Sequence, residues 1–236
     1  PSSRRNRPAV QVLVLGAGAW GLPAAAELAR RGHAVTLVDR FGPANAWSSS
    51  PGPTRIWRLS HPDRVRVRLA RRALAAMEEL AQRSGTTVHL RRGLLWRDDE
   101  TVGAVHEALT GEGVEHILVD ADEVGAHLPG LRPDGRAAVW QPDAGPVLAA
   151  ASLQAQRRLF EEAGGRLLVG LHVREVQLTG GGVRLVCEQG EELAGDVVVL
   201  APGPGAAPLL ADLGVDVPLR PRLEQVAHVA HRSGTA

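Results

Sequence analysis

The sequence predicts an α/β fold, which a mixed part of the chain makes α+β overall. Three observations support this prediction. Residues 10–15 and 34–38 are short, β-branched apolar runs on either side of an alanine-rich segment, the pattern of a parallel strand–helix–strand unit. Residues 87–144 lack this regularity and mix strand-like with helix-like pieces. A helical segment and several closely spaced strands then follow. We therefore expect a parallel-sheet region that a second, mixed substructure interrupts.

The first strand–helix–strand unit carries the local signals that each element needs. Both apolar runs have the length of strands buried on two faces. The segment between them is rich in strong helix formers, Pro23 is tolerated in a first helical turn, and Gly32 is a good stop at the helix end. Two parallel strands joined by a helix imply a right-handed crossover.

A loop and a long helix are expected next. Residues 45–53 are rich in Ser, Pro and Gly and predict an irregular loop, whereas Asp63 can cap a helix that Gly85 can end. Apolar residues recur at helical spacing and predict one stripe of this helix, made of Val65, Leu69, Ala73, Ala76 and Leu80. Four arginines lie mostly off the stripe, Arg64, Arg68, Arg71 and Arg72. We expect them to form a solvated face rather than an anion site.

The remaining elements are expected from short patterns. The mixed substructure contains strand-like pieces at residues 88–96 and 137–140, a helix at 102–112 and a loop at 141–146. A helix over 148–163 precedes four strands, at residues 166–169, 173–178, 183–188 and 196–201. The three glycines at 180–182 predict a hairpin turn.

Composition excludes several classes of function. The formal net charge is +1 and only 3% of residues are aromatic, which gives no support to nucleic-acid binding. The chain contains no lysine and no tyrosine, so a lysine-dependent phosphate loop, a Schiff-base lysine and a Tyr/Lys proton relay are excluded for it. Cys187 is the single cysteine and has no partner for an internal disulfide, which indicates a cytoplasmic protein.

Membrane and export signals are weak. No segment approaches the roughly 20 apolar residues of a membrane span, so we expect no membrane partner. Residues 3–7 are similar to a twin-arginine signal, but the apolar stretch after them runs straight into a glycine motif. We therefore expect a basic tail.

The sharpest motif is GAGAWG at residues 16–21, placed where a strand ends and a helix begins. Gly16 permits a tight turn, Gly18 lets a diphosphate approach the backbone, and Gly21 lets the helix pack closely on the strand. Asp39 ends the next strand, about 20 residues on, where an acid binds a ribose hydroxyl. This order predicts dinucleotide binding; the alternatives are a glycine-rich turn without a ligand and a solvated Asp39.

The late strand distinguishes between two kinds of dinucleotide fold. Residues 197–203 form a second apolar run that ends in glycine, after a predicted β-hairpin. This discontinuous layout resembles flavoproteins of the glutathione-reductase-like superfamily, which have an FAD-binding Rossmann fold with a β-meander and a mixed-sheet substrate domain. A nicotinamide-linked dehydrogenase is the alternative.

Four collinear stretches narrow the resemblance. They are residues 16–40, the motif SPGPTRIWR at 50–58, QPDAG at 141–145 with its following helix, and 196–203 followed by VPLRP at 217–221. Together they are most similar to the D-amino-acid-oxidase-like family, and closest to its monomeric sarcosine oxidase and N-methyltryptophan oxidase branch. The glycine motif is generic, but Thr-Arg-Ile-x-Arg after a glycine-containing loop is fairly specific.

The resemblance implies an activity. In the family, FAD oxidises a secondary amine or amino acid by hydride transfer from a substrate C–H bond to flavin N5, with O2 as the expected acceptor and imine and H2O2 as products. It implies that Arg58 binds the substrate carboxylate and that Arg55 lies beside the flavin. A guanidinium suits the first role, and positive charge stabilises a reduced anionic flavin. Either arginine could instead be a surface ion-pair partner.

The resemblance also implies a set of FAD-binding residues: Gly16, Gly18, Ala19, Gly21, Asp39, Arg40, Thr54, Val173 and Gly203. For Val173 and Gly203 a purely structural role is a close alternative. Two positions depart from the family pattern. Ser50-Pro51 stands where some members carry a histidine pair, and Gly205 stands where a tryptophan is frequent.

Domain boundaries follow from the same resemblance. We expect the FAD-binding domain at residues 1–86 and 145–216, and the substrate domain at 87–144, with its main sheet beginning at 217–236. We expect a continuation of this sheet beyond the chain rather than a degenerate half-enzyme, because an unpaired strand would leave an apolar edge exposed. A non-catalytic FAD-binding module is a further alternative.

For two other groups of side chains we expect a structural or surface role rather than a ligand. Trp47, Trp57 and Trp140 could line a pocket, but core packing is the expectation. His228 and His231 lack an acid or cysteine to complete a metal site, so we expect ordinary surface histidines and no metal.

Overall fold

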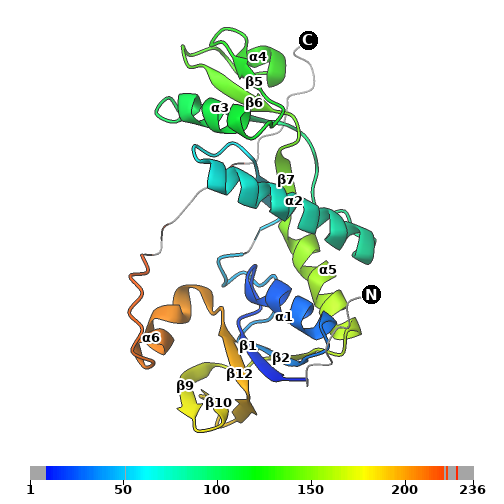
Figure 1. Ribbon diagram of the computed structural model, residues 1–236, viewed down its shortest axis with the longest axis vertical. Helices are drawn as coiled ribbons and strands as arrows, with labels where there is room; N and C mark the ends of the chain where they lie inside the picture. Colours follow the sequence, from blue (N-terminus) through cyan, green and yellow to red (C-terminus); the bar gives the residue numbers. More distant parts are fainter. Residues whose placement is uncertain (1–8, 51, 221, 223–226, 228–236) are drawn as a thin grey trace. The chain divides into compact units, whose positions relative to one another are not determined.

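The computed structural model describes residues 9–50, 52–220, 222 and 227, and the chain forms two compact units (Figure 1). Unit 1 comprises residues 1–53, 83–86 and 149–221, and unit 2 comprises 54–82, 87–148 and 222–236. This division differs from the expected domain boundary at residue 86, because residues 54–82 cluster with unit 2. Most of the sheet expected from residue 217 onward lies outside the described residues.

A parallel sheet forms the centre of unit 1. Its strands are β1 (Gln11–Leu15), β2 (Ala34–Asp39), β8 (Arg166–Val169) and β12 (Val197–Leu200), in the order β12-β1-β2-β8. Helix α1 (Gly21–Arg30) connects β1 to β2, which pair in parallel, so the predicted strand–helix–strand unit is confirmed. The carboxyl ends of β1, β2 and β12 consequently lie side by side.

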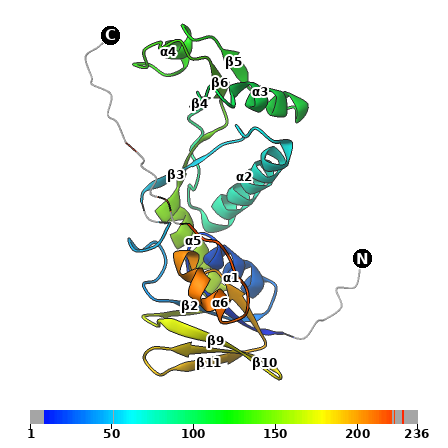
Figure 2. The ribbon, with the colours of Figure 1, turned by 90° about the vertical axis from the view of Figure 1, so that its left-hand side faces the viewer.

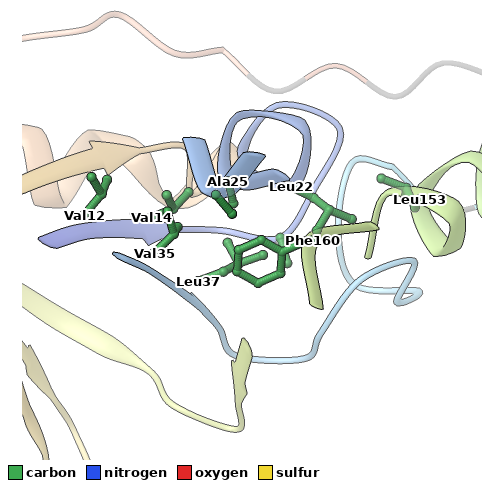
Figure 3. Packing of buried hydrophobic residues seen from close by; sticks show 10 residues of the cluster. Val12, Val14, Leu22, Ala25, Val35, Leu37, Leu153 and Phe160 are labelled. Carbon is green, nitrogen blue, oxygen red and sulfur yellow. The ribbon is translucent and has the colours of Figure 1, made fainter. Parts of the chain in front are cut away.

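Helices cover one face of this sheet. Helix α5 (Ala149–Glu162) packs beside α1, and Phe160 lies against Leu37 of the sheet (Figure 3). Phe160, Leu37 and Leu22 are fully buried. Full burial of one such side chain contributes about 1.5–3 kcal/mol. This core fixes the start of α1 relative to the strand that precedes it.

An antiparallel meander covers the opposite face. It consists of β9 (Val173–Thr179), β10 (Gly182–Cys187) and β11 (Glu192–Gly195), with β10 in the middle (Figure 2). The predicted glycine hairpin joins β9 to β10, whereas β11 was not expected from the sequence. Alternate residues of the parallel strands, including Leu13 and Leu15, pack on the meander through Leu185. Cys187 is buried and unpaired within it.

Unit 2 contains two small antiparallel sheets. Strand β3 (Thr54–Trp57) pairs with β7 (Gly145–Leu148), and β6 (Ala138–Gln141) lies between β4 (Leu94–Trp96) and β5 (Ile117–Val119). Helix α2 (Arg64–Ser84) begins in this unit, which also contains α3 (Val102–Gly111) and α4 (Val124–His127). Trp57, Val67, Leu109 and Val139 form its main core.

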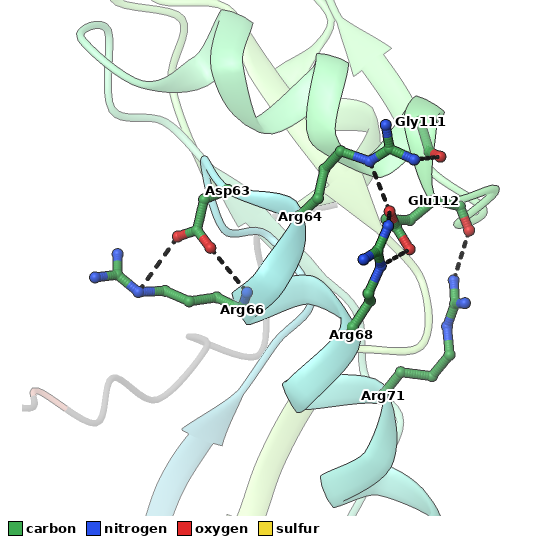
Figure 4. A network of polar contacts seen from close by, with 7 residues as sticks. All are labelled: Asp63, Arg64, Arg66, Arg68, Arg71, Gly111 and Glu112. Atoms are coloured by element: carbon green, nitrogen blue, oxygen red, sulfur yellow. Dashed lines mark hydrogen bonds and ion pairs between the residues drawn. The ribbon is translucent and has the colours of Figure 1, made fainter.

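The predicted apolar stripe of α2 is wrong. Val65 and Leu69 are 72% and 61% exposed, whereas Val67 is fully buried. A competing stripe, Val67, Ala70, Leu74 and Met77, packs into the core. Arg64 and Arg68 lie on the exposed side of the helix, and both bind the Glu112 carboxylate just after α3 (Figure 4).

The last described elements are a short 3₁₀ turn (Gly203–Gly205) and helix α6 (Ala206–Ala211), which follow β12. Their turn continues directly from the carboxyl end of the parallel sheet. In the part of the chain that the structure describes, no helix combines the length and the apolar character needed to cross a bilayer.

Candidate functional site

A cavity of about 630 Å³ lies in unit 1 at the carboxyl ends of the parallel strands. Its wall is formed by the glycine motif, the end of β2, the loop before β3, the start of β9 and the turn after β12. Crevices at this edge of a parallel sheet are where ligands bind in open α/β folds. The size is that of a site for a small molecule or cofactor.

The glycines of the motif differ in what surrounds them. A Cβ on Gly16, whose φ is +101°, would lie 2.2 Å from the Ala201 carbonyl oxygen, and one on Gly21 would lie 1.8 Å from the Gly16 oxygen. Both positions therefore require glycine for packing. A Cβ on Gly18 would meet only the Ser50 hydroxyl, at 3.4 Å, so this backbone borders the cavity.

Asp39 ties the glycine motif to the end of β2. One carboxylate oxygen accepts the Ala17 N–H at 2.8 Å, and the other accepts the N–H groups of Phe41 and Gly42 at 2.8 and 2.7 Å. The sequence suggested a ligand role and gave no sign of this bracing role. A carboxylate has about four acceptor sites, so capacity for a further donor remains.

The amino terminus of α1 is suited to an anion. Its first turn has no acidic residue and no side-chain cap, and the Ala19 N–H donates to the Ser50 hydroxyl at 3.2 Å. Unpaired N–H groups and the helix dipole together favour negative charge at such a position. The loop that carries Ser50 was predicted to be irregular, but Ser50 was not expected to contact the glycine motif.

Three exposed aromatic side chains line the same cavity. Trp20 is 85% exposed, Trp47 80% and Phe41 47%. The Phe41 and Trp47 ring centres lie 6.2 Å apart, and the Arg40 guanidinium lies 5.0 Å from the Phe41 centre. Such faces are available to stack on a planar heterocycle.

The tryptophans thus have different environments. Trp57 is buried in the core of unit 2, as expected, and Trp140 is half-buried against a smaller core cluster. The expectation of core packing is wrong for Trp47. This residue is exposed and lies in the loop between β2 and β3. Trp20 and Phe41 were missed, although each is adjacent to a predicted ligand residue or lies inside the motif.

The structure brings most of the predicted cofactor residues into one lining. They are Gly16, Gly18, Ala19, Asp39, Arg40, Val173 and Gly203. Gly21 lies behind the lining, at the first turn of α1. Thr54, Arg55 and Arg58 belong to unit 2 and are described there.

Arg58 occupies an unusual environment in unit 2. Its guanidinium carbon lies 3.9 Å from the centre of the Trp96 ring, and one terminal nitrogen donates to the Ser60 carbonyl at 2.6 Å. Among the described residues it has no carboxylate partner, and burial lowers its pKa from the ordinary value. Burial, followed by the Arg58 charge, also lowers the pKa of His61. A half-buried guanidinium without an acid is suited to receiving an external anion.

Arg55 has a more exposed position. It lies in β3, and its guanidinium donates to the Thr54 carbonyl at 2.8 Å. No group of three or more His, Cys, Asp or Glu side chains suitable for a metal occurs in the described part of the chain. His228 and His231 lie outside that part.

Comparisons with known proteins place this architecture. A family model described as FAD dependent oxidoreductase matches residues 11–236. Monomeric sarcosine oxidase from Bacillus sp. strain B-0618 is 28% identical over 216 residues, 89% of this chain and 55% of the relative. D-amino acid dehydrogenase from Cereibacter sphaeroides is 30% identical, covering 90% of this chain and 62% of its own length.

A solved structure agrees. NikD, described as an unusual amino acid oxidase essential for nikkomycin biosynthesis, superposes with a TM-score of 0.78 at 26% identity over 88% of this chain and 55% of its own. The chain therefore spans little more than half the length of these proteins. The family model matches nearly the whole sequence, and one cavity is lined by the glycine motif, Asp39 and the late glycine turn. The chain therefore belongs to the FAD dependent oxidoreductase family.

Proposed function

We propose that the protein containing this chain oxidises a secondary amine or an amino acid with FAD, passing the electrons to O2. In this proposal unit 1 is the FAD-binding domain and unit 2 is part of the substrate domain. The observation that supports FAD as the cofactor is one cavity lined by the glycine motif, Asp39 and Gly203. The two sarcosine- and amino-acid-oxidising relatives support the reaction class.

The residues of the cavity fit an extended FAD. Gly18 borders it without a side chain, so a diphosphate can approach the backbone N–H of Gly18, and it would replace the Ser50 hydroxyl as the acceptor of the Ala19 N–H. Asp39 would hold a ribose hydroxyl, Arg40 and Val173 would border the adenine end, and Gly203 would approach the flavin end. When bound, FAD supplies a hydride acceptor for the substrate C–H bond. Gly21 supports this site by letting α1 pack against the glycine turn.

Arg58 carries the proposed substrate class. Its guanidinium is half-buried and faces no acid among the described residues, so a substrate carboxylate would supply the missing negative charge. A bidentate pair would orient the substrate as well as bind it. From the sequence resemblance we also propose that Thr54 and Arg55 interact with the flavin, to which Arg55 would contribute positive charge.

An anaerobic titration of the purified holoprotein tests the proposal. An N-methyl amino acid is expected to remove the yellow flavin absorbance, and readmitted air is expected to restore it with formation of H2O2. A matched amine without a carboxylate should require a much higher concentration. Retention of the yellow colour with every N-alkyl and primary amino acid would contradict the proposed reaction.

A dehydrogenase is the second candidate, because a D-amino acid dehydrogenase is among the relatives at 30% identity. The two functions differ in the electron acceptor. After anaerobic reduction, an oxidase recovers its colour in air within seconds, whereas a dehydrogenase requires a dye or quinone. Slow recovery in air with rapid recovery by a dye would favour the dehydrogenase.

Location and partners remain part of the proposal. We propose a cytoplasmic enzyme that binds small amines or amino acids and no nucleic acid, since the net charge is +1 and the single cysteine is buried. A reporter fused to the protein and followed by cell fractionation would test the location directly.

A further inference from the structure

Two contacts determine where the Arg58 guanidinium lies. The planar group stacks on Trp96, with 3.9 Å between its carbon and the ring centre, and one terminal nitrogen donates to the Ser60 carbonyl at 2.6 Å. A guanidinium has five N–H donors. Its Nε and second terminal nitrogen make no hydrogen bond to any described residue. The face of the group is therefore occupied while part of its donor edge is available.

A hydrogen bond at the indole N–H fixes Trp96. Its indole N–H donates to the Thr101 hydroxyl at 2.9 Å, and this hydroxyl donates to Asp98 at 2.6 Å. Thr101 precedes α3 but its side chain makes no capping hydrogen bond, so its hydroxyl is used for the tryptophan instead. The indole ring cannot rotate without losing this hydrogen bond.

The Ser60 carbonyl is fixed as well. Gln141 is fully buried, and its side-chain oxygen accepts the Leu59 N–H at 2.8 Å and the Ser60 hydroxyl at 3.2 Å. Gln141 lies at the end of β6, next to β4, which carries Trp96. Both contacts of Arg58 are thus anchored on neighbouring strands of one sheet.

We propose that Trp96 is a positioning residue, which holds the Arg58 guanidinium with its donor edge free for the substrate carboxylate. Thr101 acts through Trp96 by fixing the plane of the ring. This inference rests on the proposed function, because it assigns to Arg58 the binding of that carboxylate. Stacking reduces the number of arrangements that Arg58 must give up on binding, so the effect belongs to substrate affinity.

The test uses the FAD-loaded protein and six variants of it: Trp96→Leu, Trp96→Phe, Thr101→Val, Thr101→Ser, Trp140→Leu and Arg58→Ala. Trp140 is the matched control, because it pairs with Leu95 and so points to the opposite face of the sheet from Trp96. Three quantities are measured. They are KM for an N-methyl amino acid, kcat, and the Kd of acetate, a non-oxidisable carboxylate, from the change in the flavin spectrum.

Trp96→Leu is expected to raise KM and the acetate Kd roughly tenfold, with kcat changed less than about twofold. Trp96→Phe keeps an aromatic face and should recover most of the affinity. Thr101→Val keeps the volume but removes the hydrogen-bond partner of the indole, so its KM and acetate Kd should fall between those of wild type and Trp96→Leu. Thr101→Ser keeps the hydroxyl and should bind acetate as wild type does. Trp140→Leu should leave all three quantities unchanged. For an amine substrate without a carboxylate, KM and kcat should be the same in wild type and in every Trp96 and Thr101 variant.

Equal acetate affinity in wild type and Trp96→Leu would overturn the positioning role, as would a loss confined to kcat. Should Trp96→Leu fail to fold, Thr101→Val decides in the same way. Arg58→Ala separates this inference from the proposed function. If Arg58→Ala weakens acetate binding while the Trp96 and Thr101 variants do not, only the positioning role fails. If Arg58→Ala also leaves acetate binding intact, the carboxylate assignment itself is wrong.

Discussion

Gly16 and Gly18 differ in what an added methyl group would meet. At Gly16 the methyl would lie 2.2 Å from the Ala201 oxygen in a backbone with φ of +101°, so alanine strains the fold itself. At Gly18 the only near atom is the Ser50 hydroxyl at 3.4 Å. The two positions therefore separate the stability of the sheet edge from the binding of a ligand.

Gly18→Ala is expected to fold normally and to bind FAD roughly tenfold more weakly or worse, because the methyl group intrudes on the diphosphate position. Fluorescence quenching of FAD titrated into apoprotein measures the Kd, and thermal melting of the apoprotein checks the fold. Gly181→Ala is the control, since nothing lies within 4 Å of its added Cβ. Unchanged FAD affinity in Gly18→Ala would argue against a diphosphate at this backbone.

Asp39 has a structural role as well as the proposed ribose role. Asp39→Asn loses part of the acceptor capacity for the Ala17, Phe41 and Gly42 N–H groups, so the free energy of unfolding of the apoprotein should fall by about 2 kcal/mol. FAD affinity should fall too. Urea unfolding of the apoprotein measures the first effect, with exposed Asp120→Asn as control. An unchanged unfolding midpoint would show that these hydrogen bonds add no net stability.

At the scale of elements, Glu112 joins α2 to the end of α3. Its carboxylate accepts from Arg64 and Arg68, and its backbone carbonyl accepts from Arg71 at 2.7 Å (Figure 4). Hydrogen bonds from Arg68 and then Arg64 hold the pKa of Glu112 at about 2, below its ordinary 4.5. This one acid therefore links three arginines of α2 to the end of α3, while the stripe that includes Val67 packs into the core.

The network predicts a pH-dependent stability. A depressed carboxyl pKa stabilises the fold at pH values above the unfolded pKa, and this contribution is lost as the carboxyl is protonated. The stability of wild type over Glu112→Gln should therefore be constant above about pH 5 and shrink as pH falls from 4.5 toward 2. Urea unfolding across this range measures it, with exposed Glu115→Gln as control. A difference that grows on acidification would have the wrong sign.

At the scale of the whole molecule, local patterns predicted what local interactions determine. Short sequence patterns predicted the strands β1 and β2, helix α1 and the glycine hairpin, together with the spacing from Gly16 to Asp39. Strand β3 was missed because its partner β7 lies far along the chain. The buried face of α2 was mistaken because two apolar stripes compete on this helix, and the buried one packs on residues of other segments, such as Leu109 and Val139.

The cavity was predicted only in part for the same reason. Its glycines and Asp39 belong to a recognisable spacing, but Trp47 and Ser50 reach it from an irregular loop that has no periodic signal. Likewise, nothing in the sequence around Arg58 indicated Trp96, which comes from a strand elsewhere in unit 2. The sequence predicted individual elements better than it predicted contacts between segments that are far apart in the chain.

Titration of FAD into the purified apoprotein, followed by flavin fluorescence, tests the central assignment most directly. Saturable uptake of one flavin per polypeptide is expected, together with quenching of the exposed Trp20 and Trp47, which line the cavity. A protein that remains colourless, with unaltered tryptophan emission at every FAD concentration, would contradict it.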